Sequence, residues 1–235
     1  MKNAPMLSGN LRPISVKKWL RNVLSYRHAL RFRFMSTEAV FTFIYRRGMW
    51  GAAENHSGTG STHRATTRLR AALPALLQAW GIRSMLDIPC GDFGWMQHVD
   101  LGLERYIGAD IVGVLVEQNE RRFGSEQHRF LHLDVITGAL PKVDLIFCRD
   151  CLVHLTHADG LRAVEQMKRS GSTYLMATTF TNLERNEDAV IGYWRPLNLE
   201  RPPYHFSRPL QVVDEYQEEG SGLIKSMGLW RLEDL

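Results

Sequence analysis

Short apolar runs alternate with amphipathic stretches through the middle of the sequence. Five runs of four to six residues are rich in Val, Ile, Leu, Met and Phe, and they predict buried strands. They span residues 85–88, 106–110, 130–134, 143–148 and 173–178. Helical spacing falls between them, for example over residues 112–123 and from Thr156, where Thr-x-x-Asp is typical of a helix start. Strands that alternate with helices predict a parallel sheet with right-handed crossovers.

A longer amphipathic stretch precedes the first strand and predicts a helix over residues 62–80. Its inward side carries Leu69, Leu73, Leu76, Leu77 and Trp80. Pro74 is expected to kink or split this helix, because proline removes a backbone donor. Gly81 is a natural terminator.

The alternation ends after residue 180. Residues 181–210 are Pro-rich and irregular, and two β-like segments, 210–216 and 226–232, then predict a hairpin-like end. Connections of this length are usually functional lids or binding loops. We therefore expect residues 181–210 to be a lid, with 181–206 covering an acceptor. The alternative is an irregular crossover packed on the core.

The N-terminus differs from the rest in charge. Residues 1–50 carry ten Lys and Arg and one acid, whereas residues 51–235 carry 19 Lys and Arg and 24 acids. Residues 15–34 have the spacing of a basic amphipathic helix, which either packs on the domain or lies on a membrane surface. The sequence thus divides into a basic helical extension, 1–50, and a mildly acidic domain, 51–235.

Composition narrows the class of protein. With 235 residues, 44% of them hydrophobic and 23% charged, the chain is long enough for one α/β domain with a core. No apolar run approaches the ~20 residues of a membrane-spanning helix, and we identify no signal peptide. Three cysteines, Cys90, Cys148 and Cys151, are more typical of a reducing cytosol than of a disulfide framework. We expect a cytoplasmic protein whose residues 1–35 are available for contact with a membrane surface.

Acidic residues follow the ends of three predicted strands. Asp87 and Asp92 belong to the Gly-rich turn after the first strand, where both carboxylates would repel the pyrophosphate of a dinucleotide. Asp110 ends the second strand, 19 residues after Gly91, where an acid accepts hydrogen bonds from ribose hydroxyls. Asp134 ends the third. A cofactor with an ammonium, a sulfonium and no phosphate fits this pattern, which indicates S-adenosylmethionine.

These segments resemble the class I S-adenosylmethionine-dependent methyltransferases over about residues 60–180. The resemblance rests on Leu86-Asp-Ile-Pro-Cys-Gly-Asp-Phe-Gly-Trp-Met96, Ile107-Gly-Ala-Asp110, Asp134 and Asp144-Leu-Ile-Phe-Cys-Arg-Asp-Cys-Leu-Val-His-Leu155. It implies an α/β fold with a Rossmann-like, doubly wound, seven-stranded sheet in the order 3-2-1-4-5-7-6, strand 7 antiparallel. The Pro-Cys-Gly-Asp-Phe form is similar to a bacterial subgroup with an upstream Trp-Gly and Ser-Gly-x-Gly-Ser, here Trp50-Gly51 and residues 57–61. Pro89 departs from the common family turn, in which a glycine stands at this position.

The residues expected to bind the cofactor lie in this turn and at the neighbouring strand ends. They are Asp87, Pro89, Cys90, Gly91, Asp92, Gly94, Trp95, Asp110, Ile111, Asp134 and Arg149. The fourth strand leads to Asp150 and His154, either of which can act as general base for a hydroxyl acceptor. His154 has the alternative role of holding cofactor or backbone. The Asn/Asp-Pro-Pro-Tyr/Phe segment that amine methylation uses in related folds is absent, which favours oxygen as the acceptor atom.

Aromatic residues supply candidate acceptor contacts. Tyr45 and Trp50 precede the domain, and Trp194 and Arg195 lie on the expected lid, where aromatic faces and forked donors suit a sugar or another polyol. Each aromatic residue has core packing as its alternative role. Cys148 and Cys151 form a single Cys-x-x-Cys, with Cys90 and His154 near enough to imagine zinc, but one such pair is weak and no metal is expected.

The sequence therefore predicts methyl transfer from S-adenosylmethionine, most simply to a hydroxyl of a small molecule or glycan. Two alternatives stay open. One is an RNA methyltransferase recruited by residues 1–50, although the acidic domain makes nucleic acid a poor partner. The other is a cofactor-binding scaffold without activity.

Overall fold

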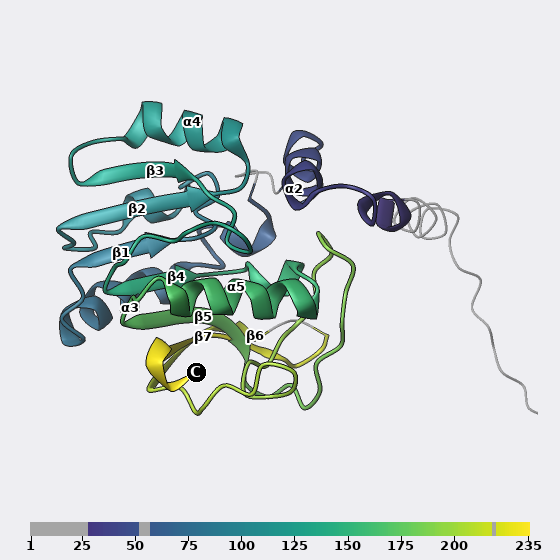
Figure 1. Cartoon of the computed structure of the whole chain (residues 1–235). Coiled ribbons are helices and arrows are strands. Elements are labelled where there is room, and N and C mark those ends of the chain that lie inside the picture. The colour runs from purple at the N-terminus through teal and green to yellow at the C-terminus, as the bar shows by residue number, and fades with distance from the viewer. Residues whose placement is uncertain (1–27, 52–56, 218–219) are drawn as a thin grey trace, which may run out of the picture.

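A computed structural model describes residues 28–51, 57–217 and 220–235 of the chain (Figure 1). Its centre is a seven-stranded sheet in the order β3-β2-β1-β4-β5-β7-β6, in which β7 runs antiparallel to both β5 and β6. The strands are β1 (Ser84–Asp87), β2 (Arg105–Asp110), β3 (His128–His132), β4 (Leu145–Cys148), β5 (Tyr174–Phe180), β6 (Gln211–Gln217) and β7 (Ile224–Arg231). The strand order and the antiparallel β7 confirm the fold that the sequence predicted.

Successive residues of the central strands bury on opposite faces of the sheet, as the two-residue period of a strand requires. Met85 of β1 packs with the apolar sides of α3 (Thr67–Ala79) and α4 (Gly113–Phe123). Its neighbour Leu86 packs on the other face, with α5 (His157–Arg169). The helices thus cover both faces and leave the carboxyl ends of the parallel strands at one edge (Figure 1).

Two local predictions need correction. The helix before the sheet begins at Thr67 and is continuous through Pro74, so it is not split there; its leucines are buried along its whole length. The third strand ends at His132 rather than at Asp134. Asp134 instead forms a turn, in which its carboxylate accepts hydrogen bonds from the Ile136 N–H at 2.9 Å and the Thr137 hydroxyl at 2.7 Å.

Much of the segment 181–210 packs on the sheet. Leu197 and Leu199 are fully buried on the α5 face. The ring of Phe206 lies 5.4 Å from that of Trp230 on β7. The expectation of a lid is corrected for this half of the segment, because its apolar side chains cover the part of the sheet near β7. The alternative, an irregular crossover packed on the core, describes residues 197–206.

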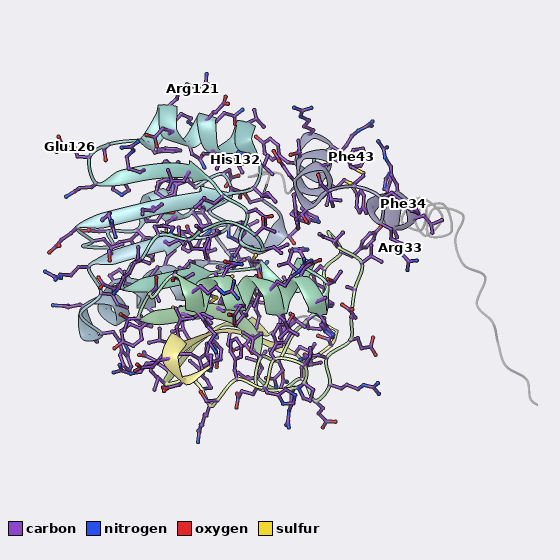
Figure 2. The ribbon with its side chains drawn as sticks, in the orientation of Figure 1. Arg33, Phe34, Phe43, Arg121, Glu126 and His132 are labelled. Carbon is purple, nitrogen blue, oxygen red and sulfur yellow. The ribbon has the colours of Figure 1, made fainter. Side chains whose placement is uncertain are left out.

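The N-terminal part of the described chain also packs on this segment. Ser36 caps α2 (Thr37–Arg46) by accepting the N–H of Ala39 at 3.2 Å. Val40 and Ile44 of α2 bury with Phe32 against Val190, Ile191 and Tyr193. Most of the amphipathic helix expected over 15–34 lies outside the described residues. Arg33 and Phe34 lie at the outer edge of the N-terminal segment (Figure 2). Within the described ranges, none of the helices has both the length and the apolar character needed to cross a membrane.

We expect Leu199→Ala to lower the free energy of unfolding by about 2–5 kcal/mol, because the truncation leaves a cavity in the core. The matched control is Leu210→Ala, at a leucine that is 46% exposed, which should change stability by less than about 0.5 kcal/mol. Urea denaturation of both variants is the measurement. Equal, small effects would show that the segment is not part of the core.

Candidate active site

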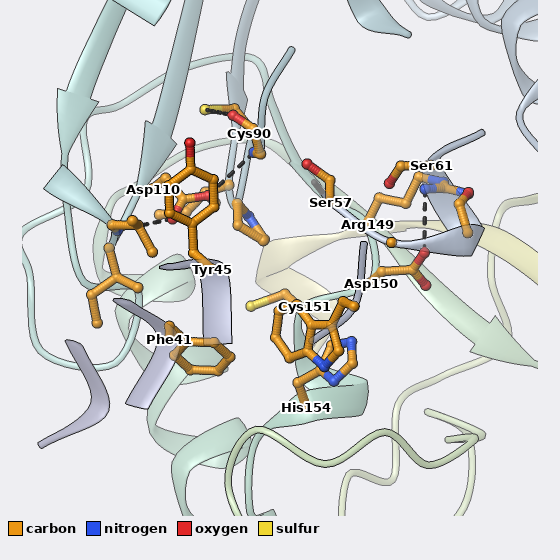
Figure 3. A pocket seen from close by; sticks show the side chains of 18 of the residues that line it. Phe41, Tyr45, Ser57, Ser61, Cys90, Asp110, Arg149, Asp150, Cys151 and His154 are labelled. Carbon is orange, nitrogen blue, oxygen red and sulfur yellow. Dashed lines mark hydrogen bonds and ion pairs between the residues drawn. The ribbon is translucent and has the colours of Figure 1, made fainter. Parts of the chain in front are cut away.

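A pocket of about 600 Å³ lies at the carboxyl ends of β1, β2 and β4 (Figure 3). Its walls come from the turn after β1, from α2 and from the Gly/Ser loop at residues 57–61. Ligand sites in open α/β sheets occupy this edge, and their volumes are commonly 300–1,000 Å³. Nearly all of the predicted cofactor residues line it: Asp87, Pro89, Cys90, Gly91, Asp92, Trp95, Asp110, Ile111, Asp134 and Arg149.

Asp110 joins the turn after β1 to the end of β2. Its carboxylate accepts the N–H of Gly91 at 3.2 Å and the N–H of Val112 at 2.9 Å. Gly91 has a φ of +56°, and a Cβ there would lie 2.6 Å from the Ser57 hydroxyl. The turn therefore requires glycine both for its conformation and for the close approach of the Ser57 loop. Asn119 Nδ2 of α4 donates to the Gly91 carbonyl at 2.7 Å and so links α4 to the same turn.

Two carboxyls on the pocket wall are buried. Asp87 is 3% exposed and accepts the Tyr106 hydroxyl at 2.6 Å. Burial raises the pKa of Asp87 to about 7, despite that hydrogen bond and the charge of Arg149. Burial likewise raises the pKa of Asp110 to about 6, against the opposing effect of the N–H groups of Val112 and Gly91. A positively charged ligand nearby would therefore stabilise the ionised form of both carboxyls.

The Ser57 loop also holds the second half of the turn. The Ser57 hydroxyl accepts the N–H of Asp92 at 3.0 Å, and Asp92 accepts the N–H of Gly94 at 3.1 Å. Gly94 itself is not among the lining residues. Its expected role in cofactor binding is thus reduced to shaping the turn.

A buried ion cluster forms another part of the pocket wall. Arg149 Nε lies 2.6 Å from Glu215 Oε1, and Lys225 Nζ lies 2.6 Å from Asp150 Oδ2 and 3.0 Å from Glu215 Oε2. Arg149 also lies 3.2 Å from Asp150 and donates to the Gly60 carbonyl at 2.7 Å. The guanidinium of Arg149 is therefore fully paired with groups of the protein. Arg149 lines the pocket, but its charge is already compensated there. Glu215 and Lys225 were not predicted: Glu215 stands beside a second acid, Asp214, in β6, and Lys225 lies one residue before the expected segment 226–232.

The two candidate bases differ in their surroundings. Although burial opposes it, Lys225 and Arg149 hold the pKa of Asp150 well below its usual range, so this carboxylate is a poor proton acceptor. His154 ends a short turn after β4, and its ring centroid lies 4.3 Å from that of Trp50. Burial lowers the pKa of His154 to about 4, so its imidazole is neutral at physiological pH. Within the described part of the chain, its buried Nδ1 has no hydrogen-bond partner.

The four predicted acceptor residues separate into two groups. Tyr45, Trp50 and Trp194 line the pocket; Tyr45 lies beside Asp110 (Figure 3), and Trp194 is 44% exposed. Arg195 is 7% exposed and is not a lining residue. Its guanidinium donates to the carbonyls of Leu152 and Glu187. Its expected contact with an acceptor is therefore corrected to the structural role of holding the 181–210 segment on the turn that carries His154.

The cysteines are free and buried. Cys148 packs inside the sheet, and burial raises the pKa of the Cys90 thiol well above its usual range. Within the described ranges, no three residues of the metal-binding types are grouped as an ion would require.

A scan of protein-family models and a search of curated proteins found no match to this sequence. Solved structures do match it. A 1,6-didemethyltoxoflavin-N1-methyltransferase from Burkholderia thailandensis, with 1,6-didemethyltoxoflavin and S-adenosylhomocysteine bound, is 16% identical with a TM-score of 0.61, over 88% of this chain and 89% of that one. The magnesium protoporphyrin IX methyltransferase of Synechocystis, with S-adenosylmethionine bound, is 13% identical with a TM-score of 0.57, over 84% and 97% of the two chains.

The chain has the fold of these methyltransferases. The same fold also includes the [4+2]-cyclase SpnF, which is 14% identical with a TM-score of 0.59 over 84% of this chain and 97% of that one. At such identities the likeness concerns the fold alone, and the chemistry has to be argued from the site.

The raised pKa of Asp87 predicts a pH dependence of stability. The folded protein holds this proton up to about pH 7, whereas the unfolded chain releases it near the ordinary value of 3.8. The carboxyl thus contributes stability at low pH, which is lost as the pH rises from about 4 to about 7. In Asp87→Asn this loss should disappear, so the difference in unfolding free energy between wild type and variant should change across that interval with a slope of up to about 1.4 kcal/mol per pH unit.

Urea denaturation at a series of pH values tests this. His154, whose lowered pKa acts with the opposite sign, is present in both proteins and cancels in the difference. Parallel stability curves for the two proteins would contradict the assignment.

Proposed function

We propose that this protein transfers a methyl group from S-adenosylmethionine to an acceptor bound in the same pocket. The observation that carries the proposal is the pair of buried carboxyls, Asp87 and Asp110, on adjacent strand ends of the pocket wall. A carboxylate at the end of β2 suits the ribose hydroxyls of a nucleoside. Desolvated acids also favour the ammonium and sulfonium of S-adenosylmethionine over a phosphate. Solved structures of this fold with S-adenosylmethionine or S-adenosylhomocysteine bound support the choice.

The charge of the pocket fits this cofactor. Arg149 and Lys225 line the pocket, but the carboxylates of Asp150 and Glu215 compensate both. The wall therefore offers no uncompensated cation from these two residues to a pyrophosphate. Asp92 and Asp134 add acids to the same wall. The Cζ atom of Arg149 lies over the ring of Trp95, 5.5 Å from its centroid. Trp95 thus adds an apolar surface to the pocket wall.

The bound cofactor would supply an electrophilic methyl group on a sulfonium. The protein's part is to place the acceptor atom in line with that group, to exclude water and to accept a proton. Trp50 and Tyr45 provide aromatic walls for the first two tasks. His154 is suited to the third because it lines the pocket, its imidazole is neutral, and its Nδ1 has no hydrogen-bond partner within the described residues, whereas Asp150 is held by Arg149 and Lys225. We therefore assign His154, rather than Asp150, as the base for a hydroxyl acceptor.

A small molecule or the end of a glycan is the acceptor class that fits best. The pocket volume is in the range of small-ligand sites. Its aromatic lining, with Trp50 and Trp194, suits a flat or polyol surface. Two neighbours of this fold act on small molecules, by their names. The alternative of a nucleic-acid acceptor is disfavoured by the acids of the pocket wall.

Cofactor binding without methyl transfer is the second candidate. The likeness to a protein described as a [4+2]-cyclase shows that this fold is not restricted to methyl transfer. Incubation with methyl-labelled S-adenosylmethionine and cell extract distinguishes the two. Enzyme-dependent transfer of label supports methyl transfer, whereas tight binding with no transfer supports the second candidate.

Asp110→Ala should weaken binding of S-adenosylmethionine by about 1.5–3 kcal/mol, the cost of losing a charged acceptor. Calorimetry on the folded variant is the measurement. The control is Glu126→Ala at an exposed acid, which should leave affinity unchanged. NAD should show no saturable binding, and its binding would overturn the charge argument.

His154→Ala should lower kcat by about 100- to 10,000-fold with nearly unchanged cofactor affinity, because it removes the proton acceptor. The rate of label transfer to the acceptor fraction found in extract is the measurement. In the wild type this rate should be flat above about pH 5, since the imidazole with its pKa of about 4 is already neutral there. An equal loss of cofactor affinity would make His154 a binding residue.

A further inference from the structure

A basic and apolar surface lies on the N-terminal segment. We call it the N-terminal patch. Its members are Leu30, Arg31, Arg33, Phe34, Arg46, Arg47 and Met49, all exposed. Phe34 is 90% exposed, Leu30 42% and Met49 41%. Figure 2 shows Arg33 and Phe34 at the outer edge of this segment, directed away from the sheet. An almost fully exposed phenylalanine next to Arg33 is a feature that the fold itself does not use.

The orientation of the N-terminal patch is fixed by packing. Phe32 and Ile44 are each 1% exposed and belong to the cluster that holds this segment on residues 190–193. The arginines therefore occupy the opposite, outward side. Arg31 and Arg47 lie over the ring of Phe43 at 4.9 and 5.4 Å. This shared ring joins the patch residues that precede α2 to those that follow it.

The charge of this region is strongly one-sided. Residues 28–51 contain four arginines and one acid, Glu38. Glu38 Oε1 lies 3.4 Å from His132 Nε2. Glu38 therefore faces the domain and does not neutralise the patch. The preceding 27 residues add six Lys and Arg and no acid. Their charge adds to the attraction of this region for an anionic partner.

We propose that the N-terminal patch docks on a bilayer that contains anionic phospholipids. Arginines at a surface of negative potential attract the protein to it. Phe34, Leu30 and Met49 then bury apolar surface at the headgroup–acyl boundary, as interfacial segments do. Nucleic acid would use the arginines equally well, but it offers no apolar layer for Leu30 and Met49. The combination of exposed aliphatic side chains with cations therefore favours the bilayer.

The patch borders the pocket. Met49 belongs to both, because it lines the pocket and is exposed on the patch. A docked protein would thus hold one edge of the pocket close to the membrane surface. The docking itself goes beyond the proposed methyl transfer and does not depend on it.

Vesicle co-sedimentation of the full chain tests the proposal. The probes are phosphatidylcholine vesicles, with and without a third of phosphatidylglycerol. We expect binding to the anionic vesicles only, and a weakening as salt is raised. Phe34→Ser should weaken that binding about tenfold through the lost apolar insertion. Arg33→Gln with Arg46→Gln should weaken it about 10- to 30-fold, at about 1 kcal/mol for each charge.

Matched controls distinguish the effect of the N-terminal patch from the effect of net charge or of surface hydrophobicity elsewhere. Arg64→Gln with Arg68→Gln removes two exposed arginines, one just before α3 and one in its first turn. Leu161→Ser changes a leucine that is 41% exposed on α5. Both should alter vesicle binding less than about twofold. Circular dichroism confirms that each variant is folded.

Several results would overturn the proposal. These are absence of binding to anionic vesicles, equal binding to neutral ones, and anionic binding that the patch variants leave intact. The last would assign the attraction to residues 1–27. A single-stranded RNA that binds and is lost in the arginine variants, while vesicle binding persists, would make the surface a nucleic-acid site.

Discussion

The ion pair between Arg149 and Glu215 holds the pocket together. Their Nε and Oε1 atoms are 2.6 Å apart, and neither side chain is exposed beyond 4%. The pair joins the residue after β4 to β6, and Arg149 extends the connection to the Gly60 carbonyl. Removing one partner of such a pair leaves an uncompensated buried charge, at a cost of about 3–5 kcal/mol. The loop that carries Ser57, and through it the turn after β1, is thus positioned by a contact between distant parts of the sequence.

This cluster also decides the electrostatics of the site. Lys225 and Arg149 are balanced by Asp150 and Glu215, so the acids of the turn have no comparable cationic partner among these four residues. Burial raises the pKa values of Asp87 and Asp110 to about 7 and about 6, and the charge of Arg149 offsets this only in part at Asp87. A ligand that brings positive charge would relieve this cost, whereas an anionic one would increase it.

The sequence predicted what local patterns determine. Short apolar runs marked the strands, and acids at successive strand ends marked the pocket edge, because parallel strands bring their carboxyl ends together. What it could not determine depended on packing between distant segments. Arg195 is a residue type common in ligand sites, yet its guanidinium donates a hydrogen bond to the carbonyl of Leu152. Glu215 and Lys225 meet Arg149 and Asp150 across 66 and 75 residues of sequence, and no local spacing signals such a contact.

The two sides of the pocket are built in different ways. The side with Asp87 and Asp110 follows from the register of β1 against β2, so it changes only if the sheet changes. The side with Trp50 and Tyr45 depends on α2 and its small apolar cluster with residues 190–193. A substitution in that cluster can move aromatic residues without disturbing any strand. Under the proposed methyl transfer, changes in the N-terminal segment would therefore alter the acceptor side of the pocket while the wall of buried acids stays fixed.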